Sequence, residues 1–238
     1  MISFKKKKGA KRIATDGDVP IFLYPNSTQP SEVKGKNIFP DVDPKSERIL
    51  VSGPSGAGKS TWVSKYAAKY KKKFPKRPIY LISSIESDAV LDKLDPIRVD
   101  MDMFDDEDDE IDPEESFTKS LVIFDDIDTI CDRPLRNSVL ALRDFMLEQS
   151  RHYKTHLICT THILMNGQQT RRLLNEGSKY VLFPNSNAHQ ISNFLQKYIG
   201  LQKRSVDRFL TEDRESRWKM ISRDYPLYVV STKSVYAV

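Results

Sequence analysis

Short apolar runs alternate with amphipathic stretches along most of the chain. Uninterrupted runs rich in β-branched and aromatic residues predict five strands. In chain order, these strands are expected at 48–52, 78–84, 120–127, 156–162 and 179–184. Helices are expected over 59–72 and 135–149, because apolar residues recur there three or four positions apart. Strands that are apolar on both faces and alternate with helices predict an α/β fold, with a mostly parallel central sheet and helices on both faces.

Each of these two helices has an expected buried face. In the first helix, the apolar stripe consists of Trp62, Val63, Tyr66, Ala67 and Tyr70. In the second helix, it consists of Val139, Leu142, Phe145 and Met146. Both stripes have the spacing of a helix that packs one side against a sheet.

The two ends of the chain have weaker patterns. One strand candidate, 19–24, interrupts an opening region rich in lysine and turn-forming residues, which predicts a flexible arm. Helical stretches at 188–199 and 203–212 precede a last strand candidate at 226–232. We therefore expect three parts, which are a basic N-terminal arm with an edge strand at 1–45, a core at 46–200 and a C-terminal helix and strand appendage at 201–238.

The composition fits one large α/β domain, or one domain with appendages. The 238 residues are 39% hydrophobic, which is enough to build a core. No apolar run reaches the roughly 18 residues of a membrane span, and the start MISFKKKKGA lacks the apolar segment of a signal peptide. Cys131 and Cys159 lie far apart without metal-type spacing, which indicates reduced thiols in a cytosolic compartment.

The net charge of +5 conceals a polarised chain. Residues 100–115 hold eleven carboxylates and no Lys or Arg, so the remaining 222 residues carry a net charge of +16. That excess suits a polyanionic partner. The acidic segment at 100–116 is expected to be loop or disorder. The basic cluster of Lys5 to Lys8, Lys11 and Arg12 has two equal readings, a solvated tail or a nucleic-acid contact.

A phosphate-binding loop follows the first strand. The stretch ILVSGPSGAGKSTW contains the complete GxxxxGK[ST] motif, Walker A, between an expected strand and an expected helix. Its glycines leave room for backbone N–H groups to face the β- and γ-phosphates, and the helix directs its positive end at them. Lys59 supplies a cation to the phosphates, and Ser60 supplies a hydroxyl to Mg²⁺. The expected ATP-binding residues are Gly53, Pro54, Ser55, Gly56, Ala57, Gly58, Lys59, Ser60 and Thr61.

The stretch LVIFDD provides the acidic half of such a site, Walker B. Asp125, at the carboxyl end of the third strand, is expected to hold Mg²⁺. Asp126 is expected to orient or deprotonate an attacking water, a role that a kinase acting on another acceptor does not need. The alternative for Asp126 is a cap on a short turn before Arg133. Asp128 is expected to be a turn residue or a cap.

The loop alone does not separate a nucleotide kinase from a motor. GPSGAGKST is also the spelling found in guanylate kinases. Such an enzyme needs a segment that reads the nucleobase soon after the loop helix. Here that space holds FPKRPIYLISSIESDAVLDKLDP, a plain strand and turn. The kinase resemblance therefore ends at the loop.

The stretch EQSRHYKTHLICTTH gives a better match. Together with GPSGAGKS and LVIFDD, it resembles the FtsK–HerA superfamily of ring-forming DNA motors. More narrowly, the three motifs look like the genome-packaging ATPases of poxviruses and other large DNA viruses of eukaryotes. The resemblance covers about residues 46–200, with the motifs in matching order and spacing.

The resemblance implies a P-loop NTPase of the additional-strand class with strand order 5-1-4-3-2. It implies that His162, at the end of the fourth strand, touches the γ-phosphate, and that Arg151 reaches the ATP of a neighbouring subunit. The superfamily usually has glutamine and glutamate where this chain has His162 and Asp126, and Glu86 is the alternative catalytic acid. His162 could instead be an ordinary loop histidine, and Arg151 a surface charge. Alternates for the arginine role are Arg143, Arg171 and Arg172.

The implied function is an ATP-hydrolysing, Mg²⁺-dependent motor that moves double-stranded DNA into a viral capsid. Its implied partners are DNA held through the backbone, further copies of the chain in a ring, and capsid or portal-vertex proteins. The loop with Asn166, Gly167 and Gln168 would be a flexible turn, and Arg171 and Arg172 would grip phosphates or line a pore. The implied location is the host cytoplasm or virus factory, and the virion. Open alternatives are a helicase-like or AAA-like clamp-loader ATPase, a nucleotide kinase and a nucleotide-gated scaffold.

Overall fold

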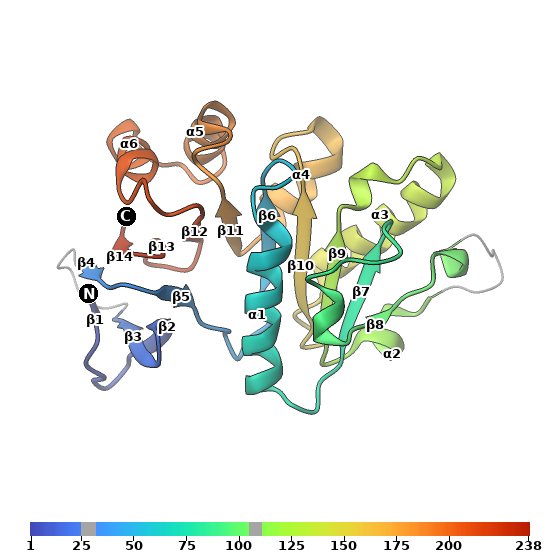
Figure 1. Ribbon diagram of the computed structural model, residues 1–238, viewed down its shortest axis with the longest axis horizontal. Coiled ribbons are helices and arrows are strands. Elements are labelled where there is room, and N and C mark those ends of the chain that lie inside the picture. Colours follow the sequence, from blue (N-terminus) through green and yellow to red (C-terminus); the bar gives the residue numbers. More distant parts are fainter. Residues whose placement is uncertain (25–31, 105–110) are drawn as a thin grey trace. The chain divides into compact units, whose positions relative to one another are not determined.

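The computed structural model describes residues 1–24, 32–104 and 111–238, and these form two compact units (Figure 1). One unit consists of residues 44–177. The other combines residues 1–43 with 178–238. The expected boundary at 45 lies close to the observed one, but residues 178–200, which we expected in the core, belong to the other unit.

The unit at 44–177 is built on a parallel sheet. Neighbouring strands pair in the order β6–β10–β9–β7–β8, and every pair is parallel. The strands are β6 (Arg48–Ser52), β10 (His156–Thr161), β9 (Leu121–Asp125), β7 (Ile79–Ser83) and β8 (Ile97–Arg98). The first four predicted strands thus lie in the order 1-4-3-2, with β10 inserted between the strand of the phosphate loop and the strand of the aspartates. The strand predicted as fifth belongs to the other unit, and its place beside the first stays a prediction.

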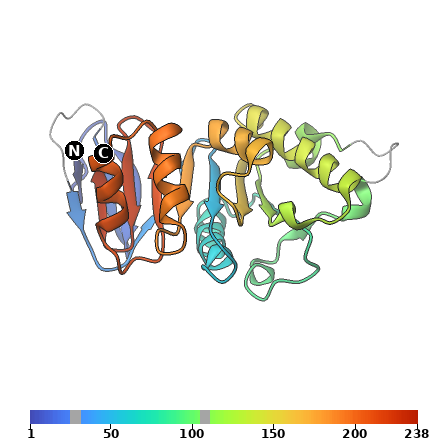
Figure 2. The same cartoon turned by 90° about the horizontal axis from the view of Figure 1, so that it is seen from above.

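Helices cover both faces of this sheet, as the alternating pattern predicted. Figures 1 and 2 show α1 (Lys59–Lys73) on one face, and α3 (Arg133–Gln149) with α4 (Gly167–Glu176) on the other. The buried apolar residues of α1 are those of the predicted stripe, namely Trp62, Val63, Tyr66, Ala67 and Tyr70.

The buried face of α3 differs from the predicted one. Val139 and Met146 are buried as expected, but Phe145 is 42% exposed. Arg143 takes a buried position instead, because its guanidinium is paired with Asp144 at 2.6 Å. A pattern of apolar residues alone could not anticipate this, since it treats arginine as a surface residue.

The acidic segment is ordered at both of its described ends, contrary to the expectation of loop or disorder. A 3₁₀ helix, η2, spans Met101–Phe104, and α2 spans Pro113–Phe117. The Asp112 carboxylate accepts the backbone N–H of Glu114 at 2.8 Å, and the buried Phe117 anchors α2. Residues 105–110 lie outside the described ranges. Two further 3₁₀ helices are η1 (Asp92–Leu94) and η3 (Ile127–Thr129).

The other unit contains two antiparallel sheets. The first has the order β1–β3–β2–β5, with β1 (Ile2–Ser3), β3 (Val19–Leu23), β2 (Lys11–Asp16) and β5 (Ile38–Pro40). The second joins β4 (Glu32–Lys34), β14 (Ser234–Ala237), β13 (Tyr228–Ser231), β12 (Lys219–Ser222) and β11 (Lys179–Leu182). Its helices are α5 (Ala188–Lys197) and α6 (Lys203–Thr211).

The start of the chain is therefore not a flexible arm, and that prediction was wrong. β2 pairs with both β3 and β5 and buries Ile13 and Ala14. Its basic residues are neutralised within the unit, because Lys11 contacts Asp43 at 2.6 Å. The C-terminal region likewise has three strands where the apolar pattern predicted one, since β12 and β14 are short and partly polar.

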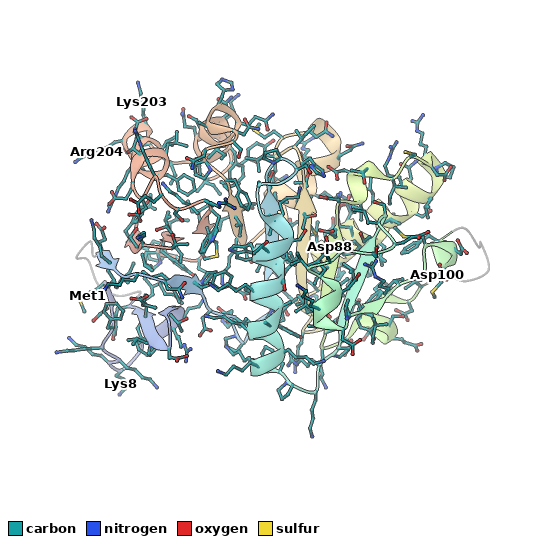
Figure 3. All side chains as sticks on the ribbon, in the orientation of Figure 1. Met1, Lys8, Asp88, Asp100, Lys203 and Arg204 are labelled. Carbon is teal, nitrogen blue, oxygen red and sulfur yellow. The ribbon has the colours of Figure 1, made fainter. Side chains whose placement is uncertain are left out.

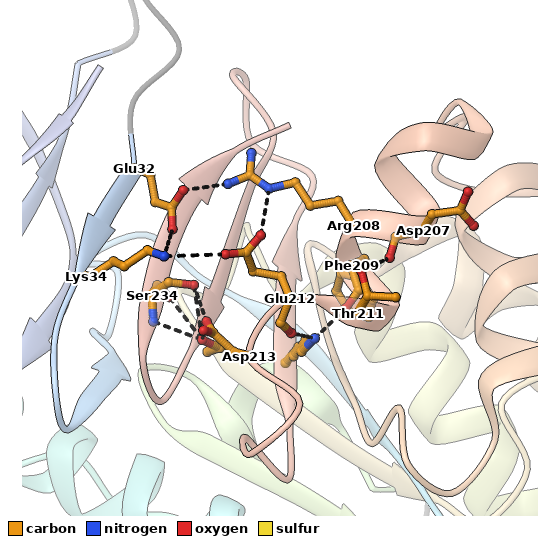
Figure 4. Close-up of polar contacts among 11 residues, drawn as sticks. Glu32, Lys34, Asp207, Arg208, Phe209, Thr211, Glu212, Asp213 and Ser234 are labelled. Carbon is orange, nitrogen blue, oxygen red and sulfur yellow. Dashed lines mark hydrogen bonds and ion pairs between the residues drawn. The ribbon is translucent and has the colours of Figure 1, made fainter.

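Charged and hydroxyl groups join α6 to the neighbouring strands (Figure 4). Arg208 pairs with Glu32 at 2.7 Å and with Glu212 at 3.4 Å. Asp213 accepts hydrogen bonds from the hydroxyls of Ser231 and Ser234. These contacts tie the C-terminal end of α6 to β4, β13 and β14.

Candidate nucleotide site

The loop between β6 and α1 has the backbone shape of a phosphate cradle. Gly56 and Gly58 have φ values of +73° and +107°, a region that suits glycine and strains other residues. Gly58 is the N-cap of α1. The Gly53 N–H donates to the Thr161 carbonyl at 3.1 Å, which fastens the loop to the end of β10. The N–H groups of the first helical turn therefore emerge at the carboxyl edge of the parallel sheet.

Lys59 is buried at the centre of this edge, with 6% of its side chain exposed. Its ammonium donates to the Gly53 carbonyl at 3.1 Å and to His162 Nδ1 at 3.3 Å. It also lies 3.5 Å from Asp126 Oδ1. The structure thus brings together three of the four predicted catalytic residues.

The contacts of His162 define its tautomer. An ammonium can only donate hydrogen bonds, so Nδ1 accepts from Lys59. Nε2 then carries the hydrogen and donates to Asp126 Oδ2 at 3.0 Å. A neutral imidazole satisfies both contacts.

Asp126 occupies the cap position that the sequence left open as its alternative role, but its side chain does not cap. By position it is the N-cap of η3, with φ +46°, but its side chain makes no capping bond. The carboxylate points instead to Lys59 and His162. Non-glycine residues in this strained backbone region are concentrated at functional sites.

Thr160, which sequence reasoning missed, joins the two aspartates. Its hydroxyl oxygen accepts the Asp126 N–H at 2.8 Å and lies 2.8 Å from Asp125 Oδ1 and 2.9 Å from Asp126 Oδ1. The signal that could have found it is the register of two parallel strands, in which Cys159 pairs with Phe124. The next residue along β10 therefore falls beside the aspartates.

Asp125 is almost completely enclosed, with 2% exposure. Burial raises its pKa to about 6, and the carboxylates of Asp126 and Asp88 add to this, while the Thr160 hydrogen bond opposes it. Asp88 is labelled in Figure 3. A hydroxyl has one hydrogen and cannot donate to both aspartates. A proton on Asp125 would satisfy the remaining contact.

Arg151 does not belong to this cluster. It is exposed and precedes β10, whereas His162 follows it. Because β10 is six residues long, the two residues lie at opposite edges of the same sheet. Arg151 therefore lies away from the phosphate loop of the same chain.

The alternates occupy other environments. Glu86 is exposed in the loop after β7. Arg143 is buried against Asp144 and also donates to the Gln169 carbonyl at 3.0 Å. Arg172 pairs with Glu148 at 3.1 Å, and Arg171 is exposed. The expected flexible turn at 166–168 is the start of α4, where the Asn166 N–H donates to Thr170 Oγ1 at 2.8 Å.

An open groove of about 760 Å³ lies along the loops after β7 and β9. Ser84 and Thr129 meet at its wall, with their hydroxyl oxygens 3.0 Å apart. Glu86, Arg98, Asp100 and Asp132 line it further.

The amino-acid sequence of the chain is similar to that of a virophage protein. The chain is 39% identical over 186 residues to the uncharacterized protein V3 of Sputnik virophage, an alignment that covers 77% of this chain and 74% of V3. The chain belongs to the V3 family. No model of a known protein family matches this V3-family chain.

Solved structures with a partly similar course of the chain include a genome packaging NTPase, a conjugation coupling protein and a secretion ATPase. The genome packaging NTPase B204 of Sulfolobus turreted icosahedral virus 2, in complex with ATP-γS, aligns with a TM-score of 0.47 and 14% identity, over 79% of the V3-family chain and 97% of B204. The pCW3 conjugation coupling protein TcpA, with ATPγS, aligns with a TM-score of 0.49 and 11% identity, over 98% of the V3-family chain and 67% of the TcpA chain. The cytoplasmic domain of the Thermomonospora curvata type VII secretion ATPase EccC aligns with a TM-score of 0.48 and 15% identity, over 98% of the V3-family chain and 26% of the EccC chain.

Two kinds of feature are absent from the described ranges of the V3-family chain. None of the helices there is both long and apolar enough to span a membrane. Among the same residues, no three of the His, Cys, Asp and Glu side chains form a cluster that could hold a metal ion.

Proposed function

We propose that the chain is an ATPase motor that translocates double-stranded DNA, and that its task is packaging of a viral genome. The observation that carries the proposal is the meeting of Lys59, Asp126 and His162 within 3.0 to 3.5 Å beside the glycine loop. These residues come from α1, the end of β9 and the end of β10. The packaging task rests on the resemblance of GPSGAGKS, LVIFDD and SRHYKTHLICTTH to viral packaging ATPases, in a chain with a virophage relative.

The phosphate chain of ATP would lie along residues 53–61. The first-turn N–H groups of α1 and the Lys59 ammonium would hold the β- and γ-phosphates. To do this, Lys59 must exchange its contacts with Gly53 and Asp126 for phosphate oxygens. Its burial favours that exchange, because a dianionic phosphate stabilises a desolvated ammonium better than a shared carboxylate does.

The donors present fit a magnesium ion held through few protein ligands. Asp125 is a buried carboxylate whose pKa is raised to about 6, so a nearby cation would favour its charged form. Ser60 stands in the first turn of α1. When bound, Mg²⁺ would neutralise charge on the β- and γ-phosphates, and carboxylate, hydroxyl and phosphate oxygens are its usual ligands.

Water would be the attacking group, and Asp126 would orient it. The carboxylate is held from three sides, by Thr160, Lys59 and His162. Once Lys59 turns to the nucleotide, Asp126 Oδ1 becomes available to accept a proton from water. His162, with its hydrogen on Nε2, would sense the γ-phosphate by exchanging partners.

The site would be completed by another copy of the chain. Arg151 lies at the edge of the sheet opposite to its own phosphate loop, a position suited to an arginine that acts on a neighbouring subunit. An arginine finger of this kind stabilises charge on the transferred phosphoryl group. A ring of such subunits is the assembly we propose. Capsid or portal-vertex proteins would be its partners in the host cytoplasm, virus factory or virion.

One experiment separates this function from its alternatives. Phosphate release from ATP should rise when double-stranded DNA is added, and the stimulation should fall steeply with salt, because backbone contacts release counterions. A rate of phosphate release that does not change when DNA is added would contradict the motor function. Phosphate transfer to a small nucleotide instead of water would establish a kinase, with the groove beside Ser84 as the acceptor site.

A further inference from the structure

Four consecutive lysines, Lys5 to Lys8, lie in the connection between β1 and β2. We call residues 4–10 the lysine loop. All four lysine side chains are exposed, and Figure 3 shows that of Lys8 pointing away from the sheet. The sequence alone left two readings for them, a solvated tail or a nucleic-acid contact. The structure shows a loop between two strands in place of a tail, and it leaves the four side chains in solvent.

The backbone of the lysine loop is fixed at its centre. The Tyr24 hydroxyl accepts the Lys7 N–H at 2.9 Å and donates to the Lys5 carbonyl. Tyr24 itself is buried, with 8% exposure, and its N–H donates to the Met1 carbonyl at 2.8 Å. A turn closes the loop, with the Ala10 N–H on the Lys7 carbonyl at 3.2 Å. These contacts hold the lysines together despite their mutual repulsion.

The neighbouring basic residues, Lys11 and Arg12, form ion pairs within the unit. Lys11 pairs with Asp43 and Asp224, each at 2.6 Å, and Arg12 pairs with Asp41 at 2.5 Å. In the described part of the chain, no ion pair is recorded for Lys5 to Lys8. The acids of the unit thus neutralise Lys11 and Arg12, the first residues of β2, and leave the lysine loop positively charged.

The whole unit shares this sign of charge. Residues 1–43 and 178–238 contain 18 Lys and Arg against 10 Asp and Glu. The unit that holds the nucleotide site, 44–177, contains 20 against 23. A polyanion would therefore be drawn to the unit that carries the lysine loop.

We propose that the lysine loop binds the phosphate backbone of double-stranded DNA, independently of sequence. The proposal rests on the proposed function, which requires DNA, and it assigns a contact surface outside the ATPase unit. Lysine ammoniums act as point charges, which suits phosphate contacts rather than the bidentate reading of bases. Four residues span at most roughly 13 Å, a length over which one strand of B-DNA carries about four phosphates.

Binding of the full-length chain to a short duplex of unrelated sequence, measured by fluorescence anisotropy across a salt series, tests the proposal. The test variant changes Lys6, Lys7 and Lys8 to Gln. The control variant removes the same charge from the exposed lysines at the end of α1 and beyond it, Lys71, Lys72 and Lys76. For the test variant, we expect the slope of log K against log salt to fall by about 2 to 3, since each phosphate contact contributes about 0.9. Its affinity should fall between about 10- and 500-fold at about 0.1 M salt.

A second variant separates the charge of the loop from its shape. Tyr24→Phe keeps every lysine and removes both hydroxyl contacts to the loop. We expect several-fold weaker binding with an unchanged salt slope. Unchanged affinity would contradict the role of the fixed loop.

Different results would overturn the proposal and the function beneath it. If the wild type binds DNA and the test variant keeps its slope and affinity, the lysine loop is not the contact, and the motor function stands. Equal losses in the test and control variants would reduce the effect to bulk charge and also refute the proposal. A wild type that neither binds DNA nor changes its ATP turnover with DNA would refute the motor function itself.

Discussion

At the scale of single residues, the site is a set of shared hydrogen bonds around two adjacent carboxylates. Asp125 is buried and contacts Thr160, whereas Asp126 contacts Thr160, Lys59 and His162. Two side chains of the same type thus have different burial and different hydrogen-bond partners. This difference suits one for a metal and the other for a water.

Asp125→Asn is expected to stabilise the nucleotide-free protein at pH 7. The pKa of Asp125 lies at about 6, above its ordinary value of 3.8, so between about pH 4 and pH 6 the folded protein holds a proton that the unfolded chain has lost. Stability from this group therefore falls as pH rises through that window. Removing the charge should return up to about 3 kcal/mol at pH 7.

Thermal unfolding of wild type and Asp125→Asn, measured at about pH 4 and about pH 7, checks this sign. The difference in melting temperature between the two proteins should be large at about pH 7 and should nearly vanish at about pH 4. ATP hydrolysis should be lost in the same variant. A variant that is less stable at pH 7 would mean that Asp125 is not a strained carboxylate.

Thr160→Val should lower kcat about 10- to 100-fold, because misplacing the aspartates disturbs the attacking water. The KM for ATP should change little, since the Thr160 hydroxyl bonds to the aspartates and not to residues proposed to hold the phosphates. Thr160→Ser keeps the hydroxyl and should restore most of the rate. If Ser and Val behave alike, the hydroxyl has no positioning role.

Sequence predicted much of this site at the residue scale. Lys59, Asp125 and Asp126 stand in two recognisable motifs, and His162 was expected from the resemblance to the FtsK–HerA superfamily. Thr160 carries no motif, because its role depends on which strand lies beside β9. That information is tertiary.

At the scale of elements, the parallel strands were predictable because each is a continuous apolar run. In the N-terminal sheet, the strand expected at 19–24 is confirmed as β3 (Val19–Leu23). β2 was not predicted, because it consists largely of polar residues whose charges are neutralised by acids distant in sequence. The face of α3 was shifted for a related reason. Arg143 is buried only because Asp144 and a carbonyl of α4 accept its hydrogen bonds.

Arg143→Met should lower the free energy of unfolding by about 2 to 4 kcal/mol, because it leaves Asp144 without its buried partner. Urea denaturation measures this, with Arg171→Met as the exposed control, for which we expect less than about 0.5 kcal/mol. ATP binding should survive in Arg143→Met. A fully stable Arg143→Met that binds ATP but cannot hydrolyse it would move the finger role from Arg151 to Arg143.

At the scale of the whole molecule, the proposed motor function requires more than one copy of the chain. Arg151→Ala should bind nucleotide normally and hydrolyse it about 10³- to 10⁵-fold more slowly. Mixing it with Asp126→Asn should restore part of the activity, because some interfaces then combine an intact Asp126 with an intact Arg151. Absence of rescue at every mixing ratio would remove Arg151 from the neighbouring site.

Whether the loop with Lys59 is the site of ATP hydrolysis is decided by phosphate release from Lys59→Ala, compared with wild type and with Lys72→Ala from the exposed end of the same helix. We predict a loss of at least about 100-fold in Lys59→Ala and full activity in Lys72→Ala, because only Lys59 is placed to stabilise the charge of the transferred phosphate. Undiminished phosphate release by pure Lys59→Ala protein would show that this loop is not the catalytic site.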